Sequence, residues 1–417
     1  MVRNKIPDGY KFTEVGVIPK DWDAIPIGKI VTDFRGGASF KPSDFKKSGV
    51  KVLPKKGVVR GGILQVEESE LQYCSQEYAD SHVRNQVDSN YTVVVLRDLV
   101  PSGPNIGLMV RIADKERYVL AQGVYGFIVQ ESNSTPGFLV QTSNTDWYRK
   151  VMNSTMVGST QVHITNTAFK QAQIPLPPLP EQTAIATALS DVDNLITSLN
   201  KLIDKKRNIK QGTMQELLTG KKRLKGFKGE WEVKTFGDIV FIRKQKIDPR
   251  NVSNDTFCIG LENIQQSTGR LIENIVPSVG LSIKSVFLKG DILFGKLRAY
   301  LRKYWLADRD GICSTEIWAF VAKQGTLSSQ YLFQLVQTDS FIEAASSSHG
   351  THMPRTDWYV IKNYSIPLPP LPEQQAIAQI LNDMDTEINQ LEQRRDKYTS
   401  IKQGMMQQLL TGKIRLI

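Results

Sequence analysis

A 51-residue segment occurs twice in this chain. Residues 174–224 align without a gap to residues 366–416, at an offset of 192 positions, and 32 of the 51 aligned residues are identical. Both copies open with Ile-Pro-Leu-Pro-Pro-Leu-Pro-Glu-Gln, whereas the regions ahead of them are much less alike. A solenoid needs at least three short repeats. The duplication therefore predicts two similar units, each a variable region followed by a constant one, with internal pseudo-two-fold symmetry.

Each constant segment predicts a long helix behind a stiff, extended lead-in. The prolines of residues 175–180 fix φ and favour an extended backbone. We expect the first helix to begin at Glu181 and to run to Leu218, before the Thr-Gly pair that ends it. Apolar residues follow at alternating steps of four and three, which is the heptad seam of a coiled coil. The predicted seam comprises Ile185, Leu189, Val192, Ile196, Leu199 and Ile203 in the first copy, and Ile377, Leu381, Met384, Ile388 and Leu391 in the second.

A helix of about 38 residues is roughly 57 Å long and cannot bury one apolar stripe by itself. We expect the two copies to pair with each other. The alternative, in which each helix packs only on its own domain, stays open. Gly212 and Gly404 lie at equivalent positions inside the predicted helices, where glycine costs about 1 kcal/mol. Their shared position predicts a close helix approach or a bend.

Composition excludes several classes of protein. With 40% hydrophobic and 23% charged residues, the chain can bury a real core. Its longest apolar runs fall far short of the ~18 residues of a membrane span, and its start lacks the apolar segment of a secretory signal. Cys74, Cys258 and Cys313 are too widely separated for a disulfide framework or a zinc ribbon. We expect a protein of the reducing cytoplasm.

The variable regions predict mixed domains without catalytic motifs. His349 and His352 lack an acidic ligand at a suitable spacing, so we expect no metal site. No phosphate-binding P-loop and no convincing S-adenosylmethionine motif occurs in the sequence. Asp191 and Asp193, repeated as Asp383 and Asp385, do not share a helix face. We interpret them as solvated or ion-paired. Strands are predicted at 91–96, 118–121, 124–129 and 317–321, and helices near 138–152 and 329–345.

Basic residues gather in each variable region. The net charge is +11 and the pI about 9.3, which favours a polyanionic partner. Seven cations lie within residues 41–60, and a second group with aromatic neighbours lies within 289–305. Such residues suit phosphate contacts and guanine reading. The alternative is a solvated surface whose aromatic residues belong to the core. In the first region, charge alone nominates Lys46, Lys55, Lys56 and Arg60 as DNA contacts.

Further motifs carry a resemblance to a known family. Both helices end in Gln-Leu-Leu-Thr-Gly-Lys-x-Arg-Leu, with Glu216 replacing the first Gln in copy one, and Leu-Lys-Gly-Phe…Trp opens the second half at 224–231. Residues 290–303 read Gly-Asp-Ile-Leu-Phe-Gly-Lys-Leu-Arg-Ala-Tyr-Leu-Arg-Lys, with Ala299 where family members often have Pro. On these motifs the whole chain resembles the specificity subunits of type I restriction–modification enzymes. The first variable region matches only in outline.

The resemblance implies an α/β fold, with two α+β target-recognition domains in a pseudo-two-fold arrangement, separated by two long antiparallel coiled-coil helices. The implied boundaries are 1–173 for the first recognition domain, 174–222 for the first proline-rich lead-in and helix, 223–365 for the second domain, and 366–417 for the second lead-in and helix.

The resemblance also implies a function without catalysis by this chain. Each domain reads one half of a bipartite double-stranded DNA target, and the helices set the spacer and dock two methyltransferase subunits. S-adenosylmethionine, ATP and Mg²⁺ are expected on partner subunits, which include two motor–nuclease subunits where a host supplies them. A coiled-coil scaffold carrying two protein-binding modules is the alternative. By position, the implied DNA contacts are Lys296, Arg298, Tyr300, Arg302 and Lys303, with Thr315 and Glu316 as base readers, and the loops Ser159, Thr160, Gln161 and Thr351, His352, Arg355.

Overall fold

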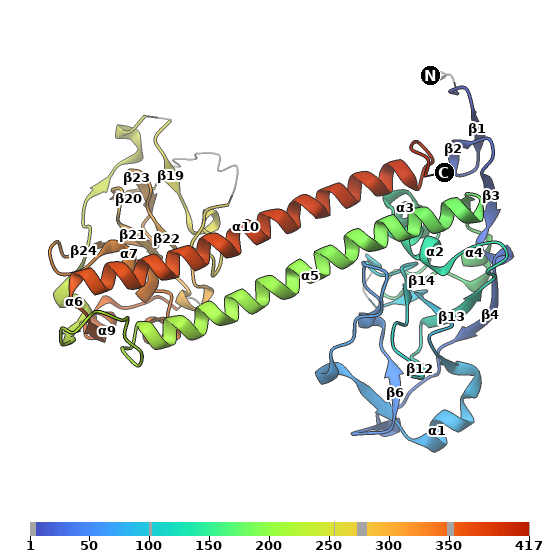
Figure 1. Cartoon of the computed structure of the whole chain (residues 1–417), viewed down its shortest axis with the longest axis horizontal. Coiled ribbons are helices and arrows are strands. Elements are labelled where there is room, and N and C mark those ends of the chain that lie inside the picture. Colours follow the sequence, from blue (N-terminus) through green and yellow to red (C-terminus); the bar gives the residue numbers. More distant parts are fainter. Residues whose placement is uncertain (1–5, 100–101, 254, 273–281, 348–353, 417) are drawn as a thin grey trace. The chain divides into compact units, whose positions relative to one another are not determined.

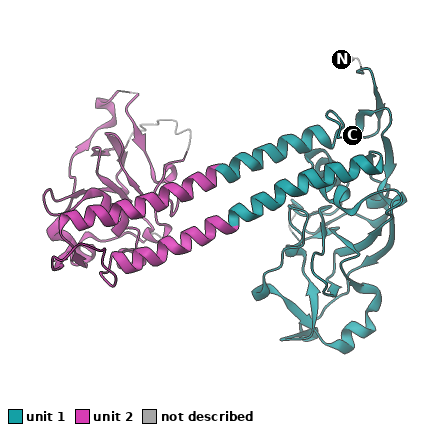
Figure 2. Cartoon of the chain, viewed as in Figure 1, with its two compact units in different colours: residues 1–200, 394–417 teal, residues 201–393 magenta. Residues whose placement is uncertain are grey.

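The computed structural model describes residues 6–99, 102–253, 255–272, 282–347 and 354–416. The chain divides into two compact units, shown in Figure 2. Unit 1 comprises residues 1–200 and 394–417, and unit 2 comprises residues 201–393. Each unit therefore contains one variable region, the first part of one constant helix and the last part of the other.

The constant segments form the two longest helices, α5 (Leu179–Leu217) and α10 (Leu371–Leu409), each of 39 residues (Figure 1). Helix α5 starts two residues before Glu181, the expected first residue. Pro180 explains this, because proline has no N–H to lose in a first turn and its φ already suits a helix. Within the described residues, no helix combines the length and apolarity needed to cross a lipid bilayer.

The described part of unit 1 is built around two larger β-sheets, with short helices and two-stranded pairs beside them. In the antiparallel sheet β11-β9-β13-β4, the buried run of residues 91–96 supplies the central strand β9, as predicted. The strand bounds are β4 Val31–Gly36, β9 Thr92–Val95, β11 Met109–Arg111 and β13 Val124–Val129. A second sheet has the order β5-β7-β6-β12-β8, with β6 parallel to β12. Its bounds are β5 Phe45–Lys46, β6 Val50–Leu53, β7 Gln72–Cys74, β8 Gln86–Val87 and β12 Tyr118–Leu120.

Smaller elements complete unit 1. The apolar core lies between the β9 sheet and helices α2, α3 and α4, where Phe127, Leu139 and Tyr148 are almost fully buried. The remaining bounds are β1 Tyr10–Thr13, β2 Gly16–Pro19, β3 Asp23–Pro26, α1 Gln76–Ser81, β10 Arg97–Asp98, α2 Pro136–Ser143, α3 Asp146–Ser154, β14 Val162–His163, α4 Asn166–Gln171 and β15 Gln173–Leu176.

Unit 2 repeats this topology. Its main sheet has the order β17-β24-β21-β22, which corresponds to β4-β13-β9-β11, and its second sheet has the order β18-β20-β23-β19. The strand bounds are β16 Glu232–Thr235, β17 Val240–Ile242, β18 Lys246–Ile247, β19 Cys258–Ile259, β20 Lys284–Phe287, β21 Ile292–Gly295, β22 Tyr304–Leu306, β23 Gly311–Ser314, β24 Ile317–Ala322 and β25 Ser365–Leu368. The helices are α6 Phe236–Ile239, α7 Ser329–Leu335, α8 Asp339–Ser346 and α9 Trp358–Ile361.

The predicted helix seam is shared between the partner helix and the domain in each unit. In unit 1, Ile185 and Leu189 of α5 are fully buried in one cluster with Leu410 and with Phe138 of α2. In unit 2, α10 and the end of α5 share a cluster with α7 and α8. Along the rest of the seam, Leu199, Ile203 and Ile388 are buried, whereas Val192, Ile196, Met384 and Leu391 are half-buried; Ile377 and Leu381 belong to the unit 2 cluster.

Gly212 and Gly404 do not mark a close helix approach, which was the first of the two expected reasons for their shared position; the bend stays a prediction. Both are exposed, and a Cβ atom added at either position meets no atom within 4 Å. The helices pack through other residues, so these glycines weaken the helix without a packing gain in the described structure.

The repeated Glu of the constant motif anchors the start of each long helix. In unit 1, the Glu181 carboxylate is buried and accepts hydrogen bonds from Trp22 Nε1 (3.0 Å) and from Arg415 Nε and Nη2 (2.7 and 2.8 Å). In unit 2, Glu373 accepts equivalent bonds from Trp231 and Arg223. The Thr-Gly-Lys-x-Arg ending of one constant segment therefore holds the start of the other.

The repeated Gln fixes each helix to its own domain. Gln182 donates to the carbonyl oxygens of Asn133 and Pro177, and its Oε1 accepts from Ser134. Gln374 makes the corresponding bonds to Thr326 and Pro369 in unit 2. Both side chains are fully buried. The repeated Glu and Gln of the constant motif thus stabilise the fold.

Of the repeated aspartates, Asp193 and Asp385 are ion-paired, whereas Asp191 and Asp383 are exposed, so each of the two interpretations holds for one pair. In unit 1, Asp193 binds Lys402 Nζ (2.6 Å) and Gln141 of α2 (3.0 Å). In unit 2, Asp385 binds Lys210 Nζ at 2.6 Å, and Gln334 of α7 lies at 3.3 Å. In both units one carboxylate therefore links the two long helices and a short domain helix.

Candidate nucleic-acid interface

Three separate segments of unit 2 meet after strand β21. The Lys296 N–H donates to the Glu316 carbonyl at 3.0 Å, the Arg298 N–H donates to the Pro354 carbonyl at 2.9 Å, and the Thr356 N–H donates to the Lys296 carbonyl at 2.8 Å. The predicted basic loop, the predicted base readers and the loop before the lead-in are therefore neighbours. Thr351 and His352, two further predicted contacts, lie outside the described residues.

A single helical turn presents part of this cluster to solvent. The turn, Ala299–Leu301, is flanked by Arg298 and Arg302, whose φ values are +54° and +51°. Such values are uncommon for residues other than glycine. Ala299 is buried beneath the turn, while the Tyr300 side chain is 52% exposed. Arg298 is also exposed and Lys296 is half-buried, so these three side chains can meet a phosphate or a base.

Other predicted contacts in unit 2 are engaged within the protein. Arg302 pairs with Asp339, and Lys303 Nζ donates to the Leu261 carbonyl at 2.5 Å. Arg355 forms a two-pronged pair with Glu316 (3.0 and 3.2 Å). The remaining predicted base reader, Thr315, is half-buried. Arg302, Lys303 and Arg355 hold the segments of the cluster together. Each of them would have to break its present contact within the protein before it could bind DNA.

Unit 1 brings the corresponding segments together. Strand β9 is the counterpart of β21. Arg97 lies two residues after the end of β9, as the first residue of β10, and pairs with His163 of β14. A Cβ atom added at Gly123 would lie about 3 Å from both the Arg97 and the Lys55 side chains, which places these two cations together. Burial lowers the pKa of Lys55, as does the charge of Arg97, whereas the charge of Asp98 raises it. The exposed turn Ser159, Thr160 and Gln161 leads into His163.

Arg97 was not identified from the sequence. The constant segments repeat at an offset of 192, whereas β9 and β21 are 200 positions apart. Aligning the halves at 192 therefore misses the equivalence of the residues that follow these strands. The signal that could have found Arg97 is the alignment of the two buried apolar strands themselves.

The other predicted cations of unit 1 are dispersed. Lys46 Nζ donates to the Ser43 carbonyl, and Lys56 forms an exposed salt bridge with Glu70 at 2.9 Å. Arg60 is exposed, and its charge lowers the pKa of the buried Arg149 in addition to the larger effect of burial. Of the four residues chosen by charge alone, Lys55 is the one that adjoins Arg97.

Most aromatic residues of the two basic regions belong to the interior. Phe40 stacks on Phe45 and on Tyr78, with ring centroids 5.1 and 4.8 Å apart. In unit 2 the buried rings are Phe294, Tyr304 and Trp305. The alternative that these aromatic residues serve packing is correct for them, and Tyr300 is the exposed exception in its region.

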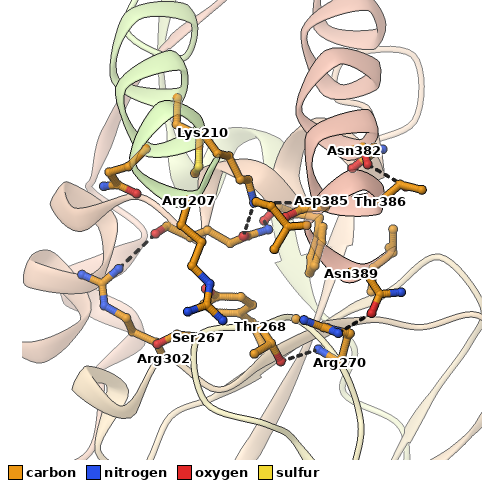
Figure 3. Close-up of a pocket in the computed structure, with 18 of the residues that line it drawn as sticks. Arg207, Lys210, Ser267, Thr268, Arg270, Arg302, Asn382, Asp385, Thr386 and Asn389 are labelled. Atoms are coloured by element: carbon orange, nitrogen blue, oxygen red, sulfur yellow. Dashed lines mark hydrogen bonds and ion pairs between the residues drawn. The ribbon is translucent and has the colours of Figure 1, made fainter. Parts of the chain in front are cut away.

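The described residues can be compared with the requirements of a metal site and of a reactive thiol. Among them, no three His, Cys, Asp or Glu side chains are arranged to hold a metal ion. The three cysteines are free and buried, and burial raises the pKa of Cys313 to about 12. A cavity of about 860 Å³ in unit 2, shown in Figure 3, is lined by both apolar and charged side chains, and charged groups of the lining pair with one another, such as Lys210 with Asp385. The arrangement suits recognition of a polyanion.

Comparison with protein families agrees with this architecture. The chain matches the family described as "Type I restriction modification DNA specificity domain" twice, over residues 19–210 and 228–400. It is 26% identical to the MjaVIII specificity subunit of a type I restriction enzyme from Methanocaldococcus jannaschii, covering 96% of this chain and 94% of the relative. It is 23% identical to the EcoDI specificity subunit of Escherichia coli, covering 62% of this chain and 66% of the relative.

Solved structures share the fold. The crystal structure of a type I restriction–modification S subunit from M. genitalium superposes with a TM-score of 0.59 at 14% identity, covering 97% of each chain. A chain from a study of complex assembly and conformational transition of the type I restriction–modification system gives a TM-score of 0.51 at 15% identity, covering 95% of this chain and 99% of that one. The predicted fold, with two α/β domains and a packed pair of long helices, is confirmed.

Proposed function

Because the chain belongs to the type I restriction–modification DNA specificity family, we propose that each of its two variable domains reads one half of a bipartite DNA target. The chain is the component that confers DNA target specificity and is itself non-catalytic. The proposal concerns which surfaces do this and how the two half-sites are combined.

One observation carries the proposal. In both units, the segment after the central strand meets the loop that precedes the proline-rich lead-in, through Arg97 with His163 and through Leu297 with Arg355. Each junction has cations at or near the surface. Cations supply the sequence-independent attraction to phosphates, and arginine and polar loop residues can read base edges. Two such junctions on one duplicated topology fit two half-sites.

The long helices support the second part of the proposal, in which they set the spacer and dock partner subunits. Each has 39 residues, or about 58 Å at 1.5 Å per residue. Each begins in one unit and ends in the other. The partners we propose are two methyltransferase subunits and, where a host supplies them, two motor–nuclease subunits. S-adenosylmethionine, ATP and Mg²⁺ belong to those partners, and the complex acts on DNA in the cytoplasm.

The test is selection from a random duplex library. The chain is purified with its modification subunits, and bound DNA is sequenced at two salt concentrations. We expect two short defined blocks separated by a fixed unspecified gap. Exchange of residues 1–173 for the matching region of a relative should change one block and leave the other intact. A single contiguous site, or no enrichment, contradicts the proposal.

The alternative is a scaffold carrying two protein-binding modules. Salt dependence separates the two functions, because neutralising DNA phosphates releases counterions and makes the affinity fall steeply with salt. A protein scaffold does not bind added duplex DNA with an affinity that falls steeply with salt. Lys296→Ala with Arg298→Ala should reduce the slope of log K against log salt by about 2 if both contact phosphates.

A further inference from the structure

Unit 2 contains two separate apolar clusters. The first joins the main sheet to α7, α8 and both long helices. The second joins the second sheet to the main sheet, because it unites Ile259, Phe287 and Cys313 with Leu293 of β21 and Ala319 of β24, and it contains no residue of α5 or α10 among its described members. We call the second sheet, β18-β20-β23-β19, together with the turn at residues 265–270 the distal lobe. The described apolar contacts of this cluster therefore do not join the distal lobe directly to the long helices.

A tight turn of the distal lobe extends toward helix α10. The turn is closed by the bridge between Ile264 and Leu271 and by the Gln265 N–H, which donates to the Arg270 carbonyl at 2.9 Å. Gly269 has a φ of +68°, and a Cβ atom there would lie 2.6 Å from the Phe333 ring of α7. The position requires glycine both by conformation and by space. The turn is thus held in one shape, with Arg270 at its exit.

Arg270 binds α10 through two side chains. Its guanidinium donates to the Asn389 side-chain oxygen and to one oxygen of the Glu392 carboxylate. The other Glu392 oxygen accepts from Arg207 Nη2 of α5 at 2.6 Å. Glu392 is only 7% exposed. One buried carboxylate therefore connects the distal lobe, α10 and α5.

The contact between Arg270 and Glu392 lies at the edge of a cavity. The cavity of about 860 Å³ lies between the turn and the helices, and its lining includes the turn residues 266–270 together with Asn389 and Glu392 (Figure 3). Where a cavity separates two elements, few van der Waals contacts hold their angle. Among the described residues, the turn also contacts Phe333 of α7 and donates from the Ser267 N–H to the Arg302 carbonyl at 2.9 Å. Arg270 supplies its hydrogen bonds to α10, so it is well placed to control the angle between the turn and that helix.

Unit 1 lacks the same residues at the corresponding positions. A Cβ atom at Gly62 would lie 2.8 Å from Val140 of α2, as the one at Gly269 would from Phe333 of α7. The residue after Gly62 is Ile63, where unit 2 has Arg270, and the constant helix has Asn200 where α10 has Glu392. Neither charge of the pair is present at these positions, so the link is specific to the second domain.

We propose that Arg270 is a positioning residue, which fixes the distal lobe of the second recognition domain on α10 and so makes the DNA spacer strict. This rests on the proposed function. The predicted base readers Thr315 and Glu316 directly follow β23 of the distal lobe. If the lobe can tilt, these residues can reach a half-site one base pair nearer or farther, whereas a fixed lobe holds them at one distance. The inferred role concerns the tolerated distance between half-sites and leaves the sequence of each half-site unchanged.

The experiment measures binding of the complex with its modification subunits to duplexes that carry both selected blocks at the preferred gap or at a gap one base pair shorter or longer. We expect Arg270→Ala to reduce the preference for the correct gap by about ten-fold, the size expected for a lost charge-assisted hydrogen-bonded contact. Arg270→Lys, which keeps the charge, should restore part of the preference. The two blocks selected by each variant should be identical.

Arg207→Ala is the matched control, because it removes the other arm of the same Glu392 carboxylate without touching the distal lobe. It should lower the melting temperature and retain the gap preference. A folded Arg270→Ala chain with the parental gap preference overturns the inference. If Arg270→Ala does not fold, an Arg270→Lys chain that folds and keeps the full parental gap preference also overturns it. The inference is likewise overturned if Arg207→Ala reduces the gap preference as much as the Arg270 variants do. If the parental chain selects no two-block site, the proposed function fails instead.

Discussion

Single carboxylates hold the two constant segments to one another. Glu181 and Glu373 are both buried, and each is bound by a tryptophan and by an arginine from the end of the other constant segment. The sequence shows that these glutamates repeat, but not that their partners lie 234 and 150 positions away. Long-range pairs of this kind are not encoded by local spacing, which is why the role of this Glu could not be predicted.

Arg415→Ala should destabilise the protein by about 2 to 4 kcal/mol, because it leaves the buried Glu181 carboxylate without its guanidinium partner. The measurement is urea-induced unfolding followed by circular dichroism. Arg309→Ala is a suitable control, since Arg309 is exposed and pairs with its neighbour Asp308. It should change the free energy of unfolding by less than about 0.5 kcal/mol. Equal effects of the two substitutions would refute the anchoring role.

Glu392 makes stability depend on pH in the acid range. Burial alone would raise its pKa, but the guanidiniums of Arg270 and Arg207 outweigh burial and hold the pKa below the ordinary value of 4.5. A depressed carboxylate pKa contributes stability that is present above the unfolded pKa and is lost as pH falls through the folded one. Melting temperatures between pH 6 and about 3 should therefore fall more steeply for the parent than for Glu392→Gln. Parallel curves would show that this carboxylate is not the source.

The cysteines should be inert in the folded chain. Burial raises the pKa of Cys313 to about 12, and Cys74 and Cys258 are also buried. The thiolate is the reactive form, so an aromatic disulfide reagent at pH 8 should react slowly until denaturant is added. Rapid reaction of one thiol in the native protein would show local opening around that residue.

At the scale of elements, periodicity predicted the long helices well. The heptad spacing predicted that α5 and α10 are long helices, and the proline run and the Thr-Gly pair located their ends to within two residues. The strands at 92–95, 124–129 and 317–322 were also predicted from apolar runs. What periodicity missed was Arg97, whose role depends on strand equivalence between two divergent domains.

The two helical glycines give a test at this scale. Gly212→Ala and Gly404→Ala should each stabilise the protein by about 0.5 to 1 kcal/mol, because alanine favours the helix and no atom obstructs the new methyl group. The measurement is the urea midpoint at constant m-value. As a contrast, Gly158→Ala should destabilise, since Gly158 has a φ of +107° and an added Cβ atom would lie 2.1 Å from the Gln161 carbonyl oxygen. A loss of stability at Gly212 or Gly404 would indicate a contact that the isolated chain does not show.

For the whole molecule, the duplication matters more than any single site. The variable domains retain the same strand order in their main sheets although little sequence similarity remains between them. Conserved topology places the binding segments at equivalent junctions, while side chains at those junctions differ, as Arg97 and Leu297 do. Under the proposed function, the chain combines two unlike recognition surfaces on one repeated framework, and we expect the helices to set the distance between the half-sites.

That last relation is open to a direct test. Seven heptad-matched residues are inserted into both helices, between Asn200 and Lys201 in α5 and between Gln393 and Arg394 in α10, which are the boundaries between the two units. Seven residues preserve the phase of the seam and lengthen each helix by about 10.5 Å. At 3.4 Å per base pair, the preferred gap should grow by about three base pairs while both blocks stay the same. Insertion into α5 alone should destabilise the chain, because it shifts one half of the seam against the other. An unchanged gap in the double insertion would show that partner subunits, rather than these helices, determine the spacer.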